Sequence, residues 1–356
     1  MLEAVGKYSF VNAKIRARLS SLMTREALMK LLDARDPADF FAGLAGTPYE
    51  AIFAKPEAAA DPKLAERLLV EEEVQWHADI IKALKEPERS LVATMLERYE
   101  LENLKVALRV REGDRDRGDL AYVVRKPLPH SLRLEEIATA RSLEDVFPYL
   151  ANTPYLGPLR KSLEECKEKG TLFPAEIALE LDFYRRIETG IKALSRADRT
   201  IARKLMGIEI DLRNIGWLMR LKFYYGISST ELVDYLIPGG YRLTSYQLRR
   251  AFMPDSVKDV LTVLSLIILE REFSLAADLL RNEEEIGKLY FIEIILSKYM
   301  LIEIRKILEG YPFTIGTVLA YLILKRAEVQ NLTTILNGKL LSLDKPEIEK
   351  HLRSAY

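Results

Sequence analysis

Apolar residues recur every three or four positions along most of the chain, which is the spacing of amphipathic helices. Near the start, five apolar residues follow this spacing with basic residues between them: Tyr8, Val11, Ile15, Leu19 and Leu22. Similar stripes run through residues 64–74 and 179–191. Alternating apolar and polar runs between tight turns, the signal of strands, are almost absent. The pattern predicts an all-α protein.

The ends of several helices are also indicated by residue type. Thr24, Ser142 and Ser228 precede helical stretches, where their side chains can accept hydrogen bonds from amides of the first turn. Glycines that favour a left-handed helix end follow four stretches: Gly113, Gly170, Gly226 and Gly310.

A short pattern occurs three times, in residues 100–111, 211–222 and 328–339. Each copy has an acid, an Asn three positions later, then Leu or Ile, and a closing base. The Asn residues are Asn103, Asn214 and Asn331, and the bases are Arg111, Lys222 and Lys339. Arg109 and Arg220 occupy one further position in the first two copies, where the third copy has Asn337. The spacing of about 115 residues is too long for a solenoid repeat and fits a domain-sized module.

A second repeated segment supports this division. Residues 39–49 (DFFAGLAGTPY) return as residues 145–155 (DVFPYLANTPY), so Tyr49 and Tyr155 end equivalent segments. A third Thr-Pro-Tyr is absent, and we expect its nearest remnant around residues 241–252. Gly113 and Gly226 each follow a motif copy, which predicts three helical modules: residues 1–113, 114–226 and 227–356.

Composition narrows the class of protein. At 356 residues, with 49% hydrophobic and 30% charged residues, the chain is long and apolar enough for a substantial core. Its formal net charge is zero, which argues against a nucleic-acid-binding protein. One cysteine, Cys166, excludes an internal disulfide framework and favours a reducing, cytoplasmic location. No apolar run reaches the length of about 20 residues that a membrane-spanning helix requires.

Candidate chemistry is sparse. The histidines His77, His130 and His351 are far apart in the sequence, so we expect surface or capping roles and no zinc site. Residues 310–317 have a glycine-rich spacing without the lysine of a phosphate loop. We expect Cys166 to be an incidental surface residue and residues 71–73 (Glu-Glu-Glu) to form a solvated helix face. The sequence thus predicts no catalytic residue, no metal site and no cofactor.

The repeated residues are expected to be structural. A mid-helix Asn between apolar neighbours usually bonds to a nearby backbone and fixes how two elements pack, although contact with a partner is the alternative. Thr-Pro-Tyr is typical of a helix start, with Thr capping, Pro in the first turn and Tyr packed inside. The aromatic clusters in residues 222–226 and 288–293 fit either a partner interface or a helical core.

Residues 8–24 (YSFVNAKIRARLSSLMT) resemble the start of the C subunit of archaeal and bacterial V-type or A-type ATPases, the homologue of the vacuolar ATPase d subunit. That family has an aromatic-rich first helix with Asn-Ala-Arg or Asn-Ala-Lys, here Asn12, Ala13 and Lys14. It also has a Leu…Thr-x-Tyr box, here Leu44, Thr47 and Tyr49. Its Asp-x-x-Asn-Ile/Leu…Arg-x-Lys…Gly helix matches residues 211–226, and the resemblance extends along the whole chain in order.

The resemblance implies three related helical modules around a pseudo-threefold axis, forming a funnel with a central cavity. Such a protein is peripheral to the membrane, on the cytoplasmic face of the proteolipid ring of a rotary ATPase. Its cavity receives the tip of the central shaft, which the D and F subunits form. It couples the soluble ATPase head to proton or sodium transport and is not itself an enzyme.

Two other functions compete with this one. A cytosolic all-helical scaffold that binds partner helices fits the composition, although repeats in such proteins normally span about 30–50 residues. An enzyme whose site forms between modules would lack the His, Cys and phosphate-loop signals that catalysis usually leaves in a sequence.

Overall fold

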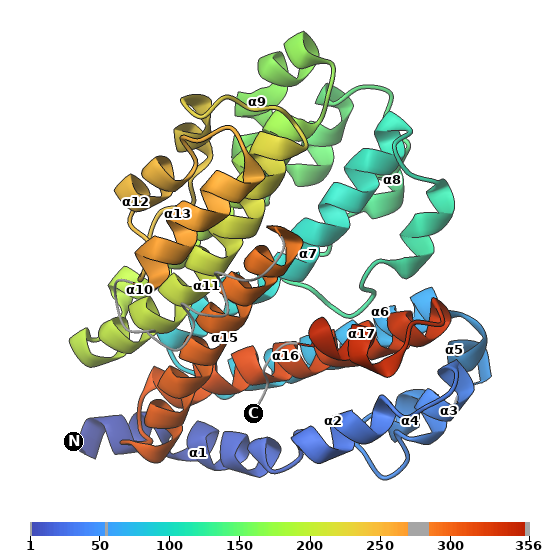
Figure 1. The fold of residues 1–356 in the computed structure, drawn as a ribbon, viewed down its shortest axis with the longest axis vertical. Helices are drawn as coiled ribbons and strands as arrows, with labels where there is room; N and C mark the ends of the chain where they lie inside the picture. The colour runs from blue at the N-terminus through green and yellow to red at the C-terminus, as the bar shows by residue number, and fades with distance from the viewer. Residues whose placement is uncertain (1, 54–55, 270–284, 353–356) are drawn as a thin grey trace. The chain divides into compact units, whose positions relative to one another are not determined.

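The computed structural model describes residues 2–53, 56–269 and 285–352. Within these ranges all regular elements are helices and no strand occurs, so the all-α prediction is confirmed (Figure 1). None of the helices in the described ranges is long and apolar enough to cross a membrane.

The chain divides into two compact units. Unit 1 contains Met1–Gly190 and Tyr321–Tyr356, and unit 2 contains Ile191–Ala320. This division follows which helices contact one another, whereas the predicted modules follow the repeats in the sequence. The division into three modules at residues 113 and 227 therefore stays a prediction.

Unit 1 is built from both ends of the chain. Its elements are α1 (Leu2–Leu19), α2 (Arg25–Leu31), α3 (Pro37–Ala42), α4 (Glu50–Phe53), α5 (Pro56–Ala60), α6 (Pro62–Ile81), α7 (Glu88–Glu112), η1 (Arg117–Tyr122), α8 (Leu134–Ala138), η2 (Glu144–Leu150), α9 (Leu156–Lys169), most of α10 (Phe173–Ala193), most of α16 (Ile315–Leu340) and α17 (Lys345–Lys350).

Unit 2 holds the remaining described elements. They are α11 (Arg196–Phe223), η3 (Glu231–Tyr235), α12 (Ser245–Ala251), α13 (Val257–Leu269), α15 (Glu285–Glu309) and the first turns of α16. The capping predictions hold at several ends. Thr24 accepts a hydrogen bond from the amide of Ala27 at 3.2 Å, and Gly113 and Gly170 end α7 and α9 in the left-handed conformation.

Helices from the two ends of the chain share one core in unit 1. Figure 1 shows α16 and α17 running beside α2 to α5. Phe40 and Leu44, from the first part of the chain, belong to the same buried cluster as Leu332 and Leu336 of α16. Burying apolar side chains is worth about 1.5–3 kcal/mol each, so this contact ties the C-terminal motif helix to the N-terminal segment.

Candidate functional site: the motif helices and the short helices they hold

The first motif lies in α7, and its polar residues hold the segment that leads into α8. Glu100 accepts a hydrogen bond from the amide of His130 at 2.9 Å and another from the hydroxyl of Tyr155 at 3.0 Å. Asn103 donates to the carbonyl of Val124 at 2.9 Å and accepts from the amide of the same residue at 3.0 Å. The side-chain amide of Asn offers both N–H donors and a carbonyl acceptor, so it can pair with the C=O and the N–H of one residue.

The second motif lies in α11 and repeats this geometry in unit 2. Asp211 accepts hydrogen bonds from the three consecutive amides of residues 241–243, at 3.2, 2.5 and 3.2 Å. Asn214 exchanges both hydrogen bonds with Ile237, each at 2.9 Å. Burial raises the pKa of Asp211 to about 7, while the three amides oppose the rise. These contacts fix the backbone immediately before α12.

The closing base of the second motif holds the other end of α12. The ammonium of Lys222 donates to the carbonyls of Phe252 at 2.7 Å and Pro254 at 2.5 Å, and to the hydroxyl of Ser229 at 2.6 Å. Phe252 is the C-terminal capping residue of α12. A cation at this position satisfies carbonyls that lack partners within the helix and complements the helix dipole.

The third motif lies in α16 and holds the N-terminal part of the chain. Glu328 accepts from the amide of Met23 at 2.5 Å and from the hydroxyl of Tyr49 at 2.5 Å. Lys339 donates to the carbonyl of Leu32 at 2.7 Å. Met23 directly precedes the N-cap of α2 and Leu32 is its C-cap, so Glu328 and Lys339 hold α2 at both ends, as Asp211 and Lys222 hold α12.

One rule therefore describes all three copies. The acid of each motif helix binds the backbone just before a short helix: α8 for α7, α12 for α11, and α2 for α16. Asn331 is buried like Asn103 and Asn214. Asn103 and Asn214 bond to backbone, as the sequence predicted, and the contribution of the three residues to stability stays a prediction.

The two Thr-Pro-Tyr segments join this arrangement through their tyrosines. Thr47 and Thr153 accept hydrogen bonds from the amides of Tyr49 at 3.2 Å and Tyr155 at 3.3 Å. The segments directly precede α4 and α9, and both tyrosine rings are buried. Their hydroxyls reach motif acids, so each segment is bound to a motif helix that is distant in the sequence.

The spacing from similar capping residues predicts a different place for the third copy of this segment. Asp36, Ser142 and Ser256 cap equivalent helix starts, each accepting from the amide three residues on. Counting forward from these caps, Thr47 and Thr153 correspond to Ile267 and not to a position in residues 241–252. Ile267 lies inside α13, which continues to Leu269, so here the third copy extends a helix where the others begin a new one.

The two arginines that precede the closing bases are not equivalent in the structure. Arg109 forms a two-point ion pair with Glu176 of α10, at 2.6 and 2.8 Å. Arg220 is exposed and has no ion pair among the described residues. A common role for the position is thus not supported by their contacts.

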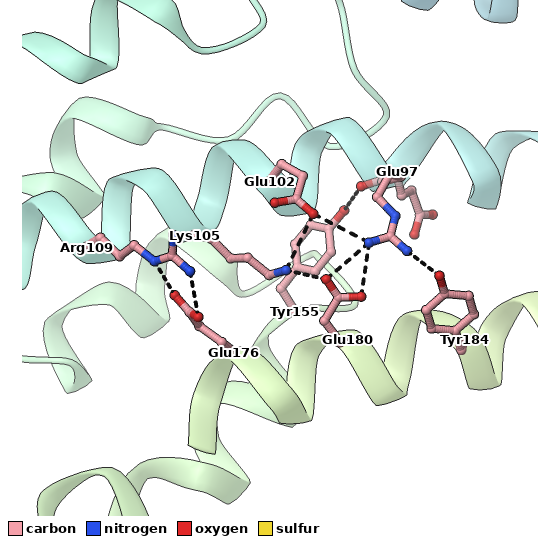
Figure 2. Close-up of polar contacts among 9 residues, drawn as sticks. Glu97, Glu102, Lys105, Arg109, Tyr155, Glu176, Glu180 and Tyr184 are labelled. Atoms are coloured by element: carbon pink, nitrogen blue, oxygen red, sulfur yellow. Dashed lines mark hydrogen bonds and ion pairs between the residues drawn. The ribbon is translucent and has the colours of Figure 1, made fainter. Parts of the chain in front are cut away.

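Next to Arg109, α7 and α10 share a buried network of charges (Figure 2). The carboxylate of Glu180 accepts from Arg98 at 3.0 and 3.1 Å and also pairs with Lys105. Arg98 donates a further bond to the hydroxyl of Tyr184 at 2.6 Å. Buried charges need such complete pairing, because one left without its partner is strongly destabilising.

A buried lysine adds a second polar centre beside the third motif. Lys325 donates to the hydroxyl of Tyr49 at 2.6 Å and pairs with Glu328 at 3.1 Å. Its ammonium also lies 4.3 Å from the ring centroids of Tyr49 and Trp76, an arrangement in which the rings attract the cation.

Several residues expected at the surface are buried instead. Glu71 accepts from the amide of Arg125 at 2.7 Å, and Glu73 accepts from the hydroxyl of Tyr99. Cys166 packs inside the end of α9. The expectation of a solvated glutamate face and a surface cysteine is therefore wrong, because partners far along the sequence cover them.

His77 is also buried, against the expectation of a surface or capping histidine. Its ring packs edge-on to Tyr99, and neither ring nitrogen has a hydrogen-bond partner within the described part of the chain. Burial lowers the pKa of His77 to about 3, so the imidazole is neutral at physiological pH. His130 and Glu97 approach to 3.4 Å, and His351 is exposed.

No group of three or more His, Cys, Asp or Glu residues in the described ranges is placed to hold a metal ion. Of the two aromatic clusters, residues 288–293 have side chains outside those that the structure describes. In the other, Tyr224 is 80% exposed and Tyr225 is 47% exposed, which favours the interface interpretation for residues 222–226 over the core interpretation.

Comparison with known proteins gives a consistent result. The family model described as ATP synthase (C/AC39) subunit matches residues 11–351. The C subunit of the A-type ATP synthase of Methanocaldococcus jannaschii is 23% identical, over 99% of this chain and 88% of its own length. The protein of the same name from Pyrococcus horikoshii is 25% identical, over 96% and 88%. That of a Desulfurococcus species is 25% identical, over 92% and 85%.

Proposed function

Because the chain belongs to the ATP synthase (C/AC39) subunit family, we propose that it is the C subunit of an A/V-type rotary ATPase. In this role it is a non-catalytic part of the complex. The observation that carries the proposal is the family match along nearly the whole chain. A generic helical scaffold would not be expected to match one family from residue 11 to residue 351.

We further propose that the protein is a socket in the central stalk. It binds the cytoplasmic face of the proteolipid ring and receives the tip of the shaft, formed by the D and F subunits, in a central cavity. Three related modules around a pseudo-threefold axis would surround that cavity. The three motif helices, each holding a short helix in the same way, support such a repeated construction.

The task of this socket is to transmit torque without yielding. One elementary charge that crosses the membrane delivers about 2.3 kcal/mol per 100 mV, and several charges act together in one rotation. Contacts to shaft and ring need to be at least of standard size, about 1,600 Å². The contacts between helices within the protein must be rigid, because helices that moved apart under load would not transmit the torque.

The buried polar contacts supply that stiffness. The pair between Asn214 and Ile237 fixes a loop to a long helix. The network of Glu180 with Arg98 and Lys105 locks α7 against α10. Such contacts are directional, so sliding one helix along its neighbour breaks them, whereas purely apolar contacts tolerate small shifts.

Co-isolation of the other ATPase subunits tests this proposal. An affinity-tagged chain is expressed in a host that lacks its own copy of this protein, and membranes are solubilised in mild detergent. The proposal predicts recovery of the ring protein together with the D and F subunits. Recovery of other soluble proteins without the ring or the shaft would contradict it.

A further inference from the structure

The short helix α12 presents a mixed aromatic and basic face to solvent. Four residues form this surface, which we call the α12 face: Tyr246, Arg249 and Arg250 of α12, and Met253, which follows the C-cap Phe252. Tyr246 is 74% exposed and Met253 is 55% exposed. On the opposite side, Leu248 and Ala251 are buried, so the helix has one face in the core of unit 2 and one in solvent.

The two arginines of the α12 face are adjacent in the sequence and both lie in solvent. Arg249 and Arg250 are exposed and form no ion pair or hydrogen bond through their side chains among the described residues. Some exposed arginines elsewhere pair with acids, as Arg35 does with Asp39 and Arg125 with Glu135. An exposed guanidinium group can donate hydrogen bonds to an anionic partner.

The equivalent short helices lack this combination. On α8, Glu135 and Glu136 are acidic and already pair with Arg125 and Arg133. On α2, the exposed positions are Arg25, Glu26 and Lys30, with no exposed aromatic residue. Since the acid of each motif helix binds the backbone before its short helix in all three copies, this difference concerns what each short helix contacts and not how it folds.

The α12 face is also held firmly in position. Thr244 and Gln247 form a capping box at its start. Asp211 fixes the backbone before the helix, and Lys222 binds the carbonyl of Phe252 after it. A preorganised face loses little conformational entropy on binding.

We propose that the α12 face binds anionic phospholipid headgroups at a membrane surface. Arginine donates bidentate hydrogen bonds to phosphate, and tyrosine favours the boundary between headgroups and hydrocarbon, where its ring is apolar and its hydroxyl is wet. Met253 adds an apolar contact at the same boundary between headgroups and hydrocarbon. This inference rests on the proposed function, which brings the chain to a membrane.

An acidic protein partner would attract the same arginines, but the composition of the face favours lipid. Tyr246 and Met253 can lie between headgroups and hydrocarbon while the two arginines bind phosphates, whereas an acidic protein surface would use only the arginines. Several exposed acids lie on or beside the elements that pack against α12: Glu231 and Asp234 on η3, Asp259 on α13, and Asp255 between α12 and α13. Asp255 is exposed and approaches Lys222 at 3.6 Å, which reduces its repulsion of phosphates.

Binding to protein-free vesicles tests the inference. The full chain is mixed with vesicles of pure phosphatidylcholine, or of phosphatidylcholine with about one third phosphatidylserine, at about 0.1 M salt. We expect binding to the anionic vesicles only. The double variant R249Q/R250Q should bind about 30-fold less tightly, because each basic residue near an anionic surface contributes about 1 kcal/mol.

The matched control is R25Q/K30Q, which removes the same charge from the exposed face of α2. It should bind anionic vesicles within about twofold of the unchanged chain. Equal loss in both variants would overturn the inference, since net charge alone would then explain binding. Absence of vesicle binding by the unchanged chain would overturn it too.

The vesicle and co-isolation experiments together distinguish failure of the lipid inference from failure of the proposed function. If R249Q/R250Q loses co-isolation with the ring while the unchanged chain does not bind vesicles, the α12 face binds protein and the lipid inference is wrong. If the unchanged chain itself fails to recover the ring and the shaft, the proposed function is wrong, whatever the vesicles show.

Discussion

Replacing Asn214 with alanine should lower the free energy of unfolding of unit 2 by about 2–4 kcal/mol. Asn214 exchanges two hydrogen bonds with Ile237, each at 2.9 Å, and both residues are buried. The alanine variant leaves one buried amide and one buried carbonyl without partners. Each such group costs about 1–2 kcal/mol, which gives the expected sum.

Fluorescence can isolate unit 2 in this experiment. The chain has two tryptophans, Trp76 in unit 1 and Trp217 in unit 2. In a common W76F background, urea unfolding followed by tryptophan emission reports on Trp217 alone. Hydrogen exchange gives a local reading, because the amide of Ile237 should exchange much faster once its acceptor is removed.

Two controls separate the possible causes. N152A changes an exposed Asn and should alter stability by less than about 0.5 kcal/mol. N214L keeps the branched shape of the side chain, with a larger volume, but not the hydrogen bonds, so it should be at least as destabilising as N214A. The reasoning is refuted if N214A unfolds at the same urea concentration as the unchanged chain with unaltered exchange at Ile237, or if N214L restores stability.

Further outcomes are expected elsewhere in the molecule. E180A should lower the free energy of unfolding of unit 1 by about 3–5 kcal/mol, because it leaves Arg98 and Lys105 without their buried partner. A loss below about 1 kcal/mol in urea unfolding would contradict this expectation. His77 has a pKa of about 3 in the folded protein and an ordinary value near 6.5 when unfolded. The free energy of unfolding should therefore fall by about 2–3 kcal/mol as the pH is lowered from about 6.5 to about 4.5. The H77L variant should lack this part of the pH dependence. Calorimetry on the isolated protein should detect no ATP binding, and micromolar affinity would contradict a non-catalytic socket.

The helical fold and the repeated motif were accessible from sequence because both are local patterns. Helical spacing and the positions of Asn103, Asn214 and Asn331 can be read directly from the chain. The backbone partner of Asn was also predictable in kind, because a mid-helix amide between apolar residues needs one. Exposed aromatics could not be told from core aromatics, since Tyr224 has the same local pattern in either case.

Contacts between distant segments were not accessible. Glu328 binds the amide of Met23, which is 305 residues away, and no periodicity points to that pairing. The same holds for Glu71, Glu73 and His77. Their charge or polarity predicts solvent exposure, and only the packed structure supplies the helices that bury them.

The coupling of ATP hydrolysis to ion transport tests the central claim most directly. Complexes assembled with and without this chain are reconstituted into vesicles, and ATP hydrolysis and ATP-driven ion uptake are measured in parallel. We predict that complexes without the chain hydrolyse ATP but do not transport ions, and that adding the purified chain restores transport. Ion uptake at the full rate in its absence would contradict the proposal that this protein joins the shaft to the ring.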